Sequence, residues 1–173
     1  ASNPAFDPNK FVVGISQKEW DGLLNNKYRP LSNKAVSGLY PPGSTFKMIV
    51  ALAALEKGVV SPGDRVFCPG KYKLGDRDFH CWNRGGHGHV NLRNALKGSC
   101  DVYFYAMAQR PGMDPIAVMA RRCGMGHEFE LPVTSQFYGT VPDPAWKLKK
   151  YEREWQAYDT VNATIGQGYM LAN

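Results

Sequence analysis

Ser44 and Lys47 have the residue types and the spacing that serine acyl transfer requires. Because residues three apart lie on one face of a helical turn, a helix that begins at Ser44 would place the hydroxyl beside the amine. A serine hydroxyl is a weak nucleophile until a base removes its proton, and a lysine can act as that base only when it is neutral. Burial and the positive end of the helix dipole both disfavour the charged amine. The same helix terminus would offer the Ser44 backbone N–H to an oxyanion.

The segment after Pro41-Pro42-Gly43 has the composition of a helix. Residues 44–57 contain no proline or glycine, and Gly58 supplies a stop. We expect this helix to be buried on nearly all sides, because apolar residues cover most of its circumference. They are Phe46, Met48, Ile49, Val50, Leu52 and Leu55. The alternative interpretation is that Ser44 is only the N-cap of a structural helix.

The remaining elements are predicted from periodicity and from turn residues. A hairpin is expected within residues 64–82, with its turn at Gly75-Asp76, followed by a Gly/His-rich loop. We further expect helices at 92–97, 102–109 and 115–123, a proline-dotted loop at 131–147, and a helix that begins within 160–171.

Four segments together resemble the class B penicillin-binding transpeptidases, and specifically their elongation group. Tyr40-Pro-Pro-Gly-Ser-Thr-Phe-Lys47 is similar to the nucleophile motif of that family, and Asn3-Pro-Ala-Phe-Asp-Pro-Asn9 to the segment upstream of it. Ser99-Cys-Asp101 resembles the second motif, and Gly166-Gln-Gly168 the turn before the last helix and strands. The resemblance implies an α-rich fragment of the α/β penicillin-binding transpeptidase (serine β-lactamase-like) fold, with mostly helices, a small β-hairpin and most of the central sheet missing.

The resemblance also implies a role for each catalytic candidate. The penultimate D-alanine of a peptidoglycan stem peptide would acylate Ser44, with Lys47 as general base and Ser99 passing protons toward the leaving amine. Asp101 stands at a position where many relatives have asparagine, whereas the elongation group is similar to this sequence in having aspartate, and it would accept a hydrogen bond from Lys47. The intact enzyme would cross-link peptidoglycan during cell-wall elongation, would be acylated by β-lactams, and would need no catalytic cofactor.

The third family motif, Lys-Ser/Thr-Gly, occurs nowhere in the 173 residues. We therefore expect residues 1–173 to be a partial transpeptidase domain that lacks the first strand and the strand of that motif. The longest apolar run, residues 48–55, is too short to cross a bilayer. By resemblance, the intact protein would lie on the periplasmic side of the bacterial inner membrane, held by an upstream helix, with an elongation-complex glycosyltransferase as partner.

Cys68, Cys81, His87 and Cys100 are a candidate zinc site. Three thiolates and one imidazole would complete a closed, tetrahedral structural site. The resemblance adds that some elongation-class relatives bind zinc through Asp, Asp, His and Cys in this region, with the last ligand inside the second motif, where Cys100 stands. A Cys68–Cys81 disulfide and plain buried thiols are the alternatives. His89 is the alternative ligand to His87.

The other polar and basic features are interpreted as structural. The net charge of +6 suits an anionic partner, and both nucleic acid and a cell-wall polymer qualify on charge alone. The basic cluster near Trp146 and Trp155 carries no nucleic-acid signature, so we expect a solvated helical face and no nucleic-acid partner. It consists of Lys147, Lys149, Lys150 and Arg153. Cys123 is expected to be a core or structural residue, and His80, His89 and His127 to be surface or hydrogen-bonded histidines and not ligands.

Two other functions are compatible with parts of this pattern. Ser-Thr-Phe-Lys also resembles class D β-lactamases and β-lactam sensor domains, although Tyr-Pro-Pro-Gly and Ser-Cys-Asp favour a transpeptidase. A zinc-stabilised binding module without catalysis would explain the cysteines and His87 but not the context of Ser44 and Lys47.

We predict that the isolated chain reacts weakly or not at all with a fluorescent penicillin. The missing Lys-Ser/Thr-Gly motif supplies the carboxylate-binding lysine and borders the second oxyanion donor in the family. Gel fluorescence after a time course of labelling measures the reaction, and rapid, stoichiometric labelling at Ser44 would contradict the prediction.

Overall fold

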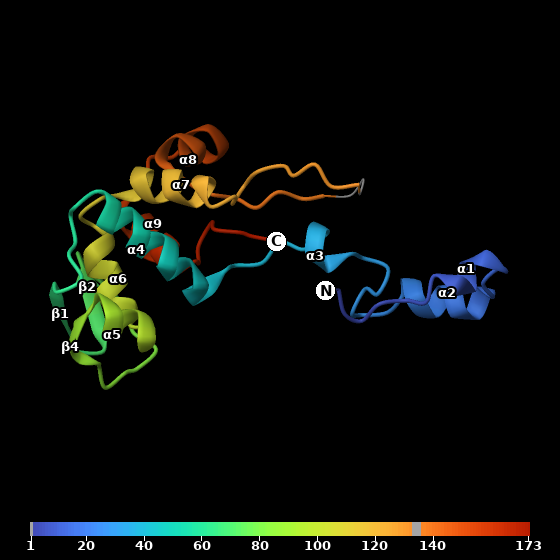
Figure 1. Ribbon diagram of the computed structural model, residues 1–173, viewed down its shortest axis with the longest axis horizontal. Helices are drawn as coiled ribbons and strands as arrows, with labels where there is room; N and C mark the ends of the chain where they lie inside the picture. Colours follow the sequence, from blue (N-terminus) through green and yellow to red (C-terminus); the bar gives the residue numbers. More distant parts are fainter. Residues whose placement is uncertain (1, 133–135) are drawn as a thin grey trace.

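Four helices packed against one another form the centre of the molecule (Figure 1). α4 (Lys47–Glu56) packs against α7 (Met113–Arg122) and α6 (Asp101–Ala108), and α6 also contacts α9 (Ala157–Thr164). α6 is buried along most of its length, because its residues are apolar or aromatic on nearly every face. This central helix therefore carries the core and, at its first turn, Asp101.

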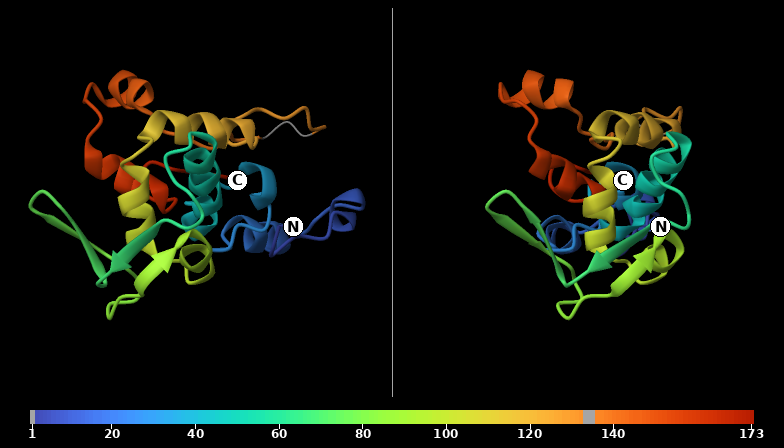
Figure 2. Two further views of the ribbon diagram at one scale, coloured as in Figure 1. Left: turned by 60° about the vertical axis from the view of Figure 1, so that its left-hand side comes forward. Right: turned by 90° about the vertical axis from the view of Figure 1, so that its left-hand side faces the viewer.

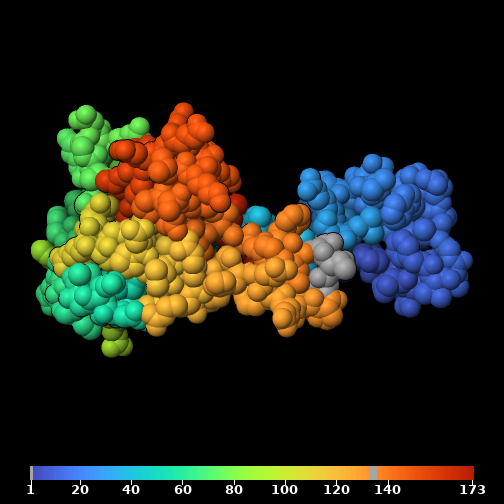
Figure 3. All heavy atoms as spheres, turned by 90° about the horizontal axis from the view of Figure 1, so that it is seen from above, coloured from blue at the N-terminus to red at the C-terminus, as the bar shows by residue number. Residues whose placement is uncertain are grey.

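The structure, a computed structural model, describes residues 2–132 and 136–173. Figures 1 and 3 show an elongated molecule with the amino-terminal helices at one end. None of the described helices has the length and hydropathy to cross a membrane. The shorter helical elements are α1 (Asn9–Val12), α2 (Gln17–Leu24), α3 (Lys34–Ser37), the 3-10 helix η1 (Gly43–Phe46), α5 (Leu92–Lys97) and α8 (Pro144–Tyr151).

Two small antiparallel sheets pack against the helices (Figure 2). The predicted hairpin is confirmed in β2 (Lys71–Leu74) and β3 (Arg77–His80), which pair across the Gly75-Asp76 turn. β1 (Arg65–Cys68) instead pairs with β4 (Gly88–Asn91), so the expected loop ends earlier than predicted. The helix-rich fold class with a small hairpin is confirmed for the described residues.

The predicted helices at 92–97, 102–109 and 115–123 are confirmed to within two residues by α5, α6 and α7. The loop predicted at 131–147 is wrong at its end, because α8 begins at Pro144. Asp143 caps that helix by accepting the Trp146 N–H at 2.7 Å, and proline is favoured at a first helical position. Residues 133–135 of the loop lie outside the described residues.

Two further expectations are corrected. α4 is not buried on nearly all sides. Met48, Leu52 and Leu55 lie along one face of this helix, at helical spacing, and all three are exposed. The last helix does not begin within 160–171 and include the glycines; α9 starts at Ala157, where a Gln156–Asp159 capping box fixes it, and ends at Thr164.

The basic cluster near Trp146 contains an unexpected buried member. Lys147 is 3% exposed and donates to the Asp159 carboxylate at 2.6 Å and to the Glu154 carbonyl at 2.9 Å, whereas Lys149 and Lys150 are exposed. Asp159 is buried as well. The ion pair therefore joins α8 to the first turn of α9, and the solvated-face prediction fails at Lys147.

We predict that Lys147→Met lowers the free energy of unfolding by about 3–5 kcal/mol, because it leaves the Asp159 carboxylate buried without its partner. The hydrogen bond to Asp159 raises the Lys147 pKa above its ordinary 10.5. The stabilisation is therefore complete below pH 10.5 and is lost as the pH rises through the raised value. Urea denaturation at several pH values measures both effects. Lys149→Met, on the exposed face, is the control, and equal loss in the two variants would contradict the prediction.

Candidate active site and cysteine–histidine cluster

Ser44 and Lys47 lie on one side of the junction between η1 and α4. The Lys47 Nζ is 3.1 Å from the Ser44 Oγ. Ser44 is exposed, whereas Lys47 is 1% exposed. Among the described residues, no backbone N–H donates to the Ser44 hydroxyl, and the N-cap residues of η1 and α4 are Pro42 and Phe46. The interpretation of Ser44 as an N-cap is therefore not supported. The first turn is a 3-10 turn, and it brings an accessible hydroxyl against a buried amine.

The Lys47 amine is surrounded by oxygen atoms from the break between α5 and α6. It donates to Ser99 Oγ and to the Ser99 carbonyl, both at 2.9 Å, and to Asp101 Oδ1 at 2.5 Å. With Ser44 Oγ these make four acceptors, one more than an ammonium can serve with its three protons. Burial and the helix dipole, the two effects that the sequence reveals, favour a neutral amine. The buried carboxylate of Asp101 acts in the opposite sense and stabilises the positive charge.

Ser99 completes a continuous chain of polar contacts. Its hydroxyl donates to Ser44 Oγ at 2.9 Å while accepting from Lys47. The Ser99 backbone has φ +50°, in the left-handed region that a residue other than glycine rarely adopts. This turn aims both the carbonyl and the hydroxyl of Ser99 at the amine. The structure thus brings together all four predicted catalytic residues, Ser44, Lys47, Ser99 and Asp101.

Gly43 and Gly166 hold the turn that carries Ser44 against the end of α9. The Gly43 N–H donates to the Gly166 carbonyl at 3.0 Å. A Cβ at Gly166 would lie 2.3 Å from the Gly43 carbonyl oxygen, and Gly166 has φ +68°. Only glycine satisfies both conditions. The Gly-Gln-Gly segment therefore packs directly beside the serine.

A cleft of about 530 Å³ opens beside the serine. Its walls are mainly polar and include Ser44, Ser99, Asp101, Trp82, Arg84 and Gln167. Trp82 was not identified from the sequence, yet its backbone N–H donates to Asp101 Oδ2 at 2.9 Å. Nothing in the local pattern marks it except its position directly after Cys81. The cleft gives a substrate direct access to the Ser44 hydroxyl.

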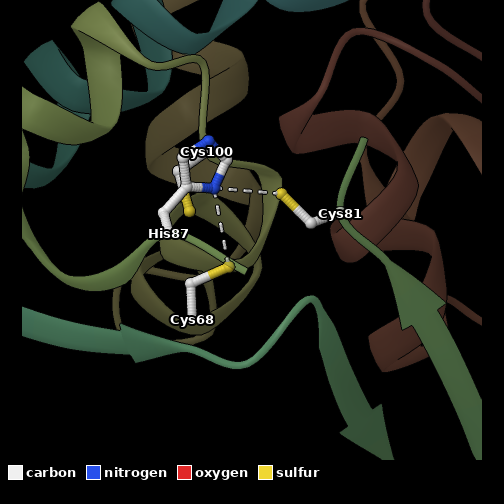
Figure 4. Close-up of side chains that lie close together, drawn as sticks. All are labelled: Cys68, Cys81, His87 and Cys100. Carbon is white, nitrogen blue, oxygen red and sulfur yellow. Dashed lines mark hydrogen bonds between the residues drawn. The ribbon is translucent and has the colours of Figure 1, made fainter. Parts of the chain in front are cut away.

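Cys68, Cys81, His87 and Cys100 point toward one another next to this site (Figure 4). They come from the end of β1, the segment after β3, the loop before β4 and the residue before α6. All four ligand atoms lie within 4.8 Å of one another, and the three cysteines are buried. His87 Nδ1 is 3.5 Å from Cys81 Sγ and 3.7 Å from Cys68 Sγ.

The geometry fits zinc. Zn–S bonds of about 2.3 Å and Zn–N bonds of about 2.0–2.1 Å place neighbouring S and N atoms of a tetrahedron roughly 3.6 Å apart. The two sulfur-to-nitrogen distances match that edge. Burial raises the pKa of the Cys100 thiol to about 12, so a cation is required to hold this residue as a thiolate. The Cys68–Cys81 disulfide is absent, since all the cysteines are free.

The other cysteine and histidines lie outside this cluster. Cys123 is exposed at the C-terminal end of α7, so the core half of its predicted role as a core or structural residue is wrong. Cys123 is the C-cap residue of α7, directly after the charged residues Arg121 and Arg122 in the last turn. His80, His89 and His127 are exposed as predicted. His89 packs its ring on Phe67, with centroids 5.0 Å apart, and is not a fourth ligand.

Comparison with known proteins fixes the family. The family described as penicillin binding protein transpeptidase domain matches residues 1–172. The chain belongs to this family.

Individual penicillin-binding proteins match over the whole chain. The peptidoglycan D,D-transpeptidase MrdA of Escherichia coli K12 is 38% identical over 173 residues, which cover 99% of this chain and 27% of that protein. The structure of Pseudomonas aeruginosa PBP2 matches with a TM-score of 0.93 and 43% identity, over 100% of this chain and 38% of that one. The structure of Helicobacter pylori PBP2 in complex with MreC matches with a TM-score of 0.95 and 37% identity, over 100% of this chain and 32% of that one. The chain thus spans about a quarter of its curated relative.

We predict that the purified protein contains one zinc ion per chain, bound by the four clustered residues. Cys68→Ser removes a ligand and should weaken zinc binding by more than the roughly 10–100-fold typical of an outer-shell change. Elemental analysis with a chelator competition measures the affinity. Cys123→Ser, which removes an exposed thiol outside the cluster, should leave it unchanged. A protein without zinc, with Cys68 and Cys81 linked in a non-reducing peptide map, would reject the site.

Proposed function

We propose that the intact protein is a peptidoglycan D,D-transpeptidase that works through an acyl-serine intermediate. The observation that carries the proposal is the network around Lys47, in which one buried amine contacts the hydroxyls of both Ser44 and Ser99. The exposed Ser44 side chain lines a cleft, so a substrate carbonyl can reach it. A hydroxyl held between a base and a second hydroxyl is the arrangement that acyl transfer uses.

Each group has a definite role in this mechanism. Lys47, in its neutral form, takes the proton of the Ser44 hydroxyl as the Ser44 Oγ attacks the carbonyl of the penultimate D-alanine. Asp101 stabilises the ammonium that forms, at 2.5 Å. The peptide bond to the terminal D-alanine breaks as Ser99 delivers its hydroxyl proton to the leaving nitrogen, and the Lys47 ammonium reprotonates Ser99 and becomes neutral again. The amine of a second stem peptide then attacks the acyl-serine and loses a proton through Ser99 and Lys47. Ser44 Oγ leaves and takes up that proton, and the cross-link is formed. A β-lactam amide bond would be opened by the same first step.

The cysteine–histidine cluster has a structural role in the proposal. Cys68, Cys81, His87 and Cys100 would hold zinc, which would cross-link the ends of the strands to the residue that precedes Asp101. No ligand position is left open, so the ion would not contact substrate. The reaction itself then needs only side-chain and backbone groups of the protein.

The proposed setting of the enzyme is the periplasmic side of the inner membrane, during cell-wall elongation. Its substrates there are stem peptides, and its proposed partners include a polymerising glycosyltransferase. The similarity to MrdA and to PBP2 proteins, one of them solved with MreC, supports this assignment.

We predict that the full-length protein is labelled by fluorescent penicillin and that Ser44→Ala abolishes labelling. Lys47→Ala should slow acylation by roughly 10²–10⁴-fold, because it removes the general base. Lys57→Ala, an exposed lysine at the end of the same helix, is the control and should acylate at the normal rate. Gel fluorescence gives the rates.

The lifetime of the label separates a transpeptidase from a β-lactamase. An acyl-enzyme that persists for hours after removal of free penicillin supports the proposal, and release within seconds would identify a β-lactamase. Undiminished labelling of Ser44→Ala would reject acyl transfer at this site and favour a binding module.

A further inference from the structure

Trp82 occupies the space between the catalytic residues and the cysteine–histidine cluster. It follows Cys81 directly in the chain and lines the cleft beside Ser44. Its side chain is 65% exposed. An exposed indole gains little from burial, so packing alone does not explain its fixed position.

Three hydrogen bonds hold Trp82 to the catalytic segment. The backbone N–H donates to Asp101 Oδ2 at 2.9 Å. The indole Nε1–H is shared between the carbonyls of Gly98 and Ser99, at 3.0 and 3.1 Å. Trp82 is therefore hydrogen-bonded to both residues of the α5–α6 break that contact Lys47, namely Ser99 and Asp101.

The shared indole bond falls on a backbone segment that needs external support. A residue with a side chain in the left-handed region persists only where its surroundings over-determine it, and Ser99 has φ +50°. The Ser99 carbonyl accepts from the Lys47 Nζ on one side and from the Trp82 indole on the other. The two donors together fix the orientation of the peptide unit and hence of the Ser99 hydroxyl.

The cluster in turn limits the movement of Trp82. Cys81 places its sulfur 3.5 Å from His87 Nδ1, and the Trp82 and His87 rings lie edge to face with centroids 5.4 Å apart. The His87 ring also lies against Gly98, where a Cβ would be 3.4 Å from its Cδ2. An ordered cluster therefore limits the movement of Trp82 both through the neighbouring Cys81 and through the edge-to-face contact with the His87 ring.

We propose that Trp82 is a positioning residue, which the cluster holds and which, through its indole N–H, keeps Ser99 in the conformation that acyl transfer needs. This inference rests on the proposed function. Trp82 acts through Ser99 and Asp101 and takes no part in bond making. Its backbone donor is present in any substituted variant, so the indole donor can be tested alone.

The test compares two variants of the full-length protein that each lose one indole donor. Trp82→Phe removes the bond to Gly98 and Ser99, whereas Trp155→Phe removes an indole bond to Thr160 at 2.8 Å, in α9. We expect the rate constant of acylation by penicillin to fall about 10-fold in Trp82→Phe, with unchanged non-covalent affinity and zinc content, and to stay normal in Trp155→Phe. Stopped-flow labelling at several penicillin concentrations separates affinity from rate.

A second measurement tests the link to the cluster without using activity. Removal of the metal by a chelator should change the tryptophan fluorescence of the wild-type protein and of Trp155→Phe, and this change should be absent in Trp82→Phe. If Trp82→Phe fails to fold, Trp82→benzothienylalanine keeps the shape of the ring and removes only the donor.

The outcomes separate the inference from the function on which it rests. A wild-type protein that penicillin does not acylate would refute the proposed function. A wild-type protein that is acylated, with Trp82→Phe as fast as Trp155→Phe, would overturn the positioning role alone. If the chelator leaves the fluorescence of the wild-type protein unchanged, or changes it equally in Trp82→Phe, the role of the cluster would be overturned.

Discussion

The rest of the site depends on how the buried amine of Lys47 is paired and hydrogen-bonded. Lys47 is almost completely buried, and an unpaired ammonium there would cost several kcal/mol. Asp101 compensates for that cost, and the two serine hydroxyls and the Ser99 carbonyl complete the shell. The groups come from segments more than fifty residues apart, so the amine can be satisfied only when the helix start and the α5–α6 break are correctly docked.

Two groups of buried polar side chains determine how these segments dock. On one side, Cys68, Cys81, His87 and Cys100 join the strands to the residue that precedes α6. On the other, the Lys147–Asp159 pair anchors the start of α9, and Gly166, just after the end of α9, contacts the turn that carries Ser44. Buried polar interactions have strict geometry and therefore specify one arrangement, in a region where apolar packing alone would tolerate several.

The sequence predicts what depends on local spacing and fails where distant residues decide. The i, i+3 relation of Ser44 and Lys47 and the boundaries of α5 are local, and both appear in the structure as expected. The pairing of β1 with β4 and the burial of Lys147 are set by residues far along the chain. No local pattern separates Lys147 from its exposed neighbours. Trp82 was missed for the same reason, since its partners lie sixteen or more residues away.

The hydrogen bonds of Asp101 explain why an aspartate, and not an asparagine, suits this position. One carboxylate oxygen accepts from the Lys47 amine and the other from the Trp82 backbone N–H. An asparagine offers one oxygen and one NH₂ group, so one of these two donors would face another donor. An amide also lacks the charge that offsets a buried ammonium. The choice of aspartate is therefore tied to the position of Trp82, and through Cys81 to the cluster.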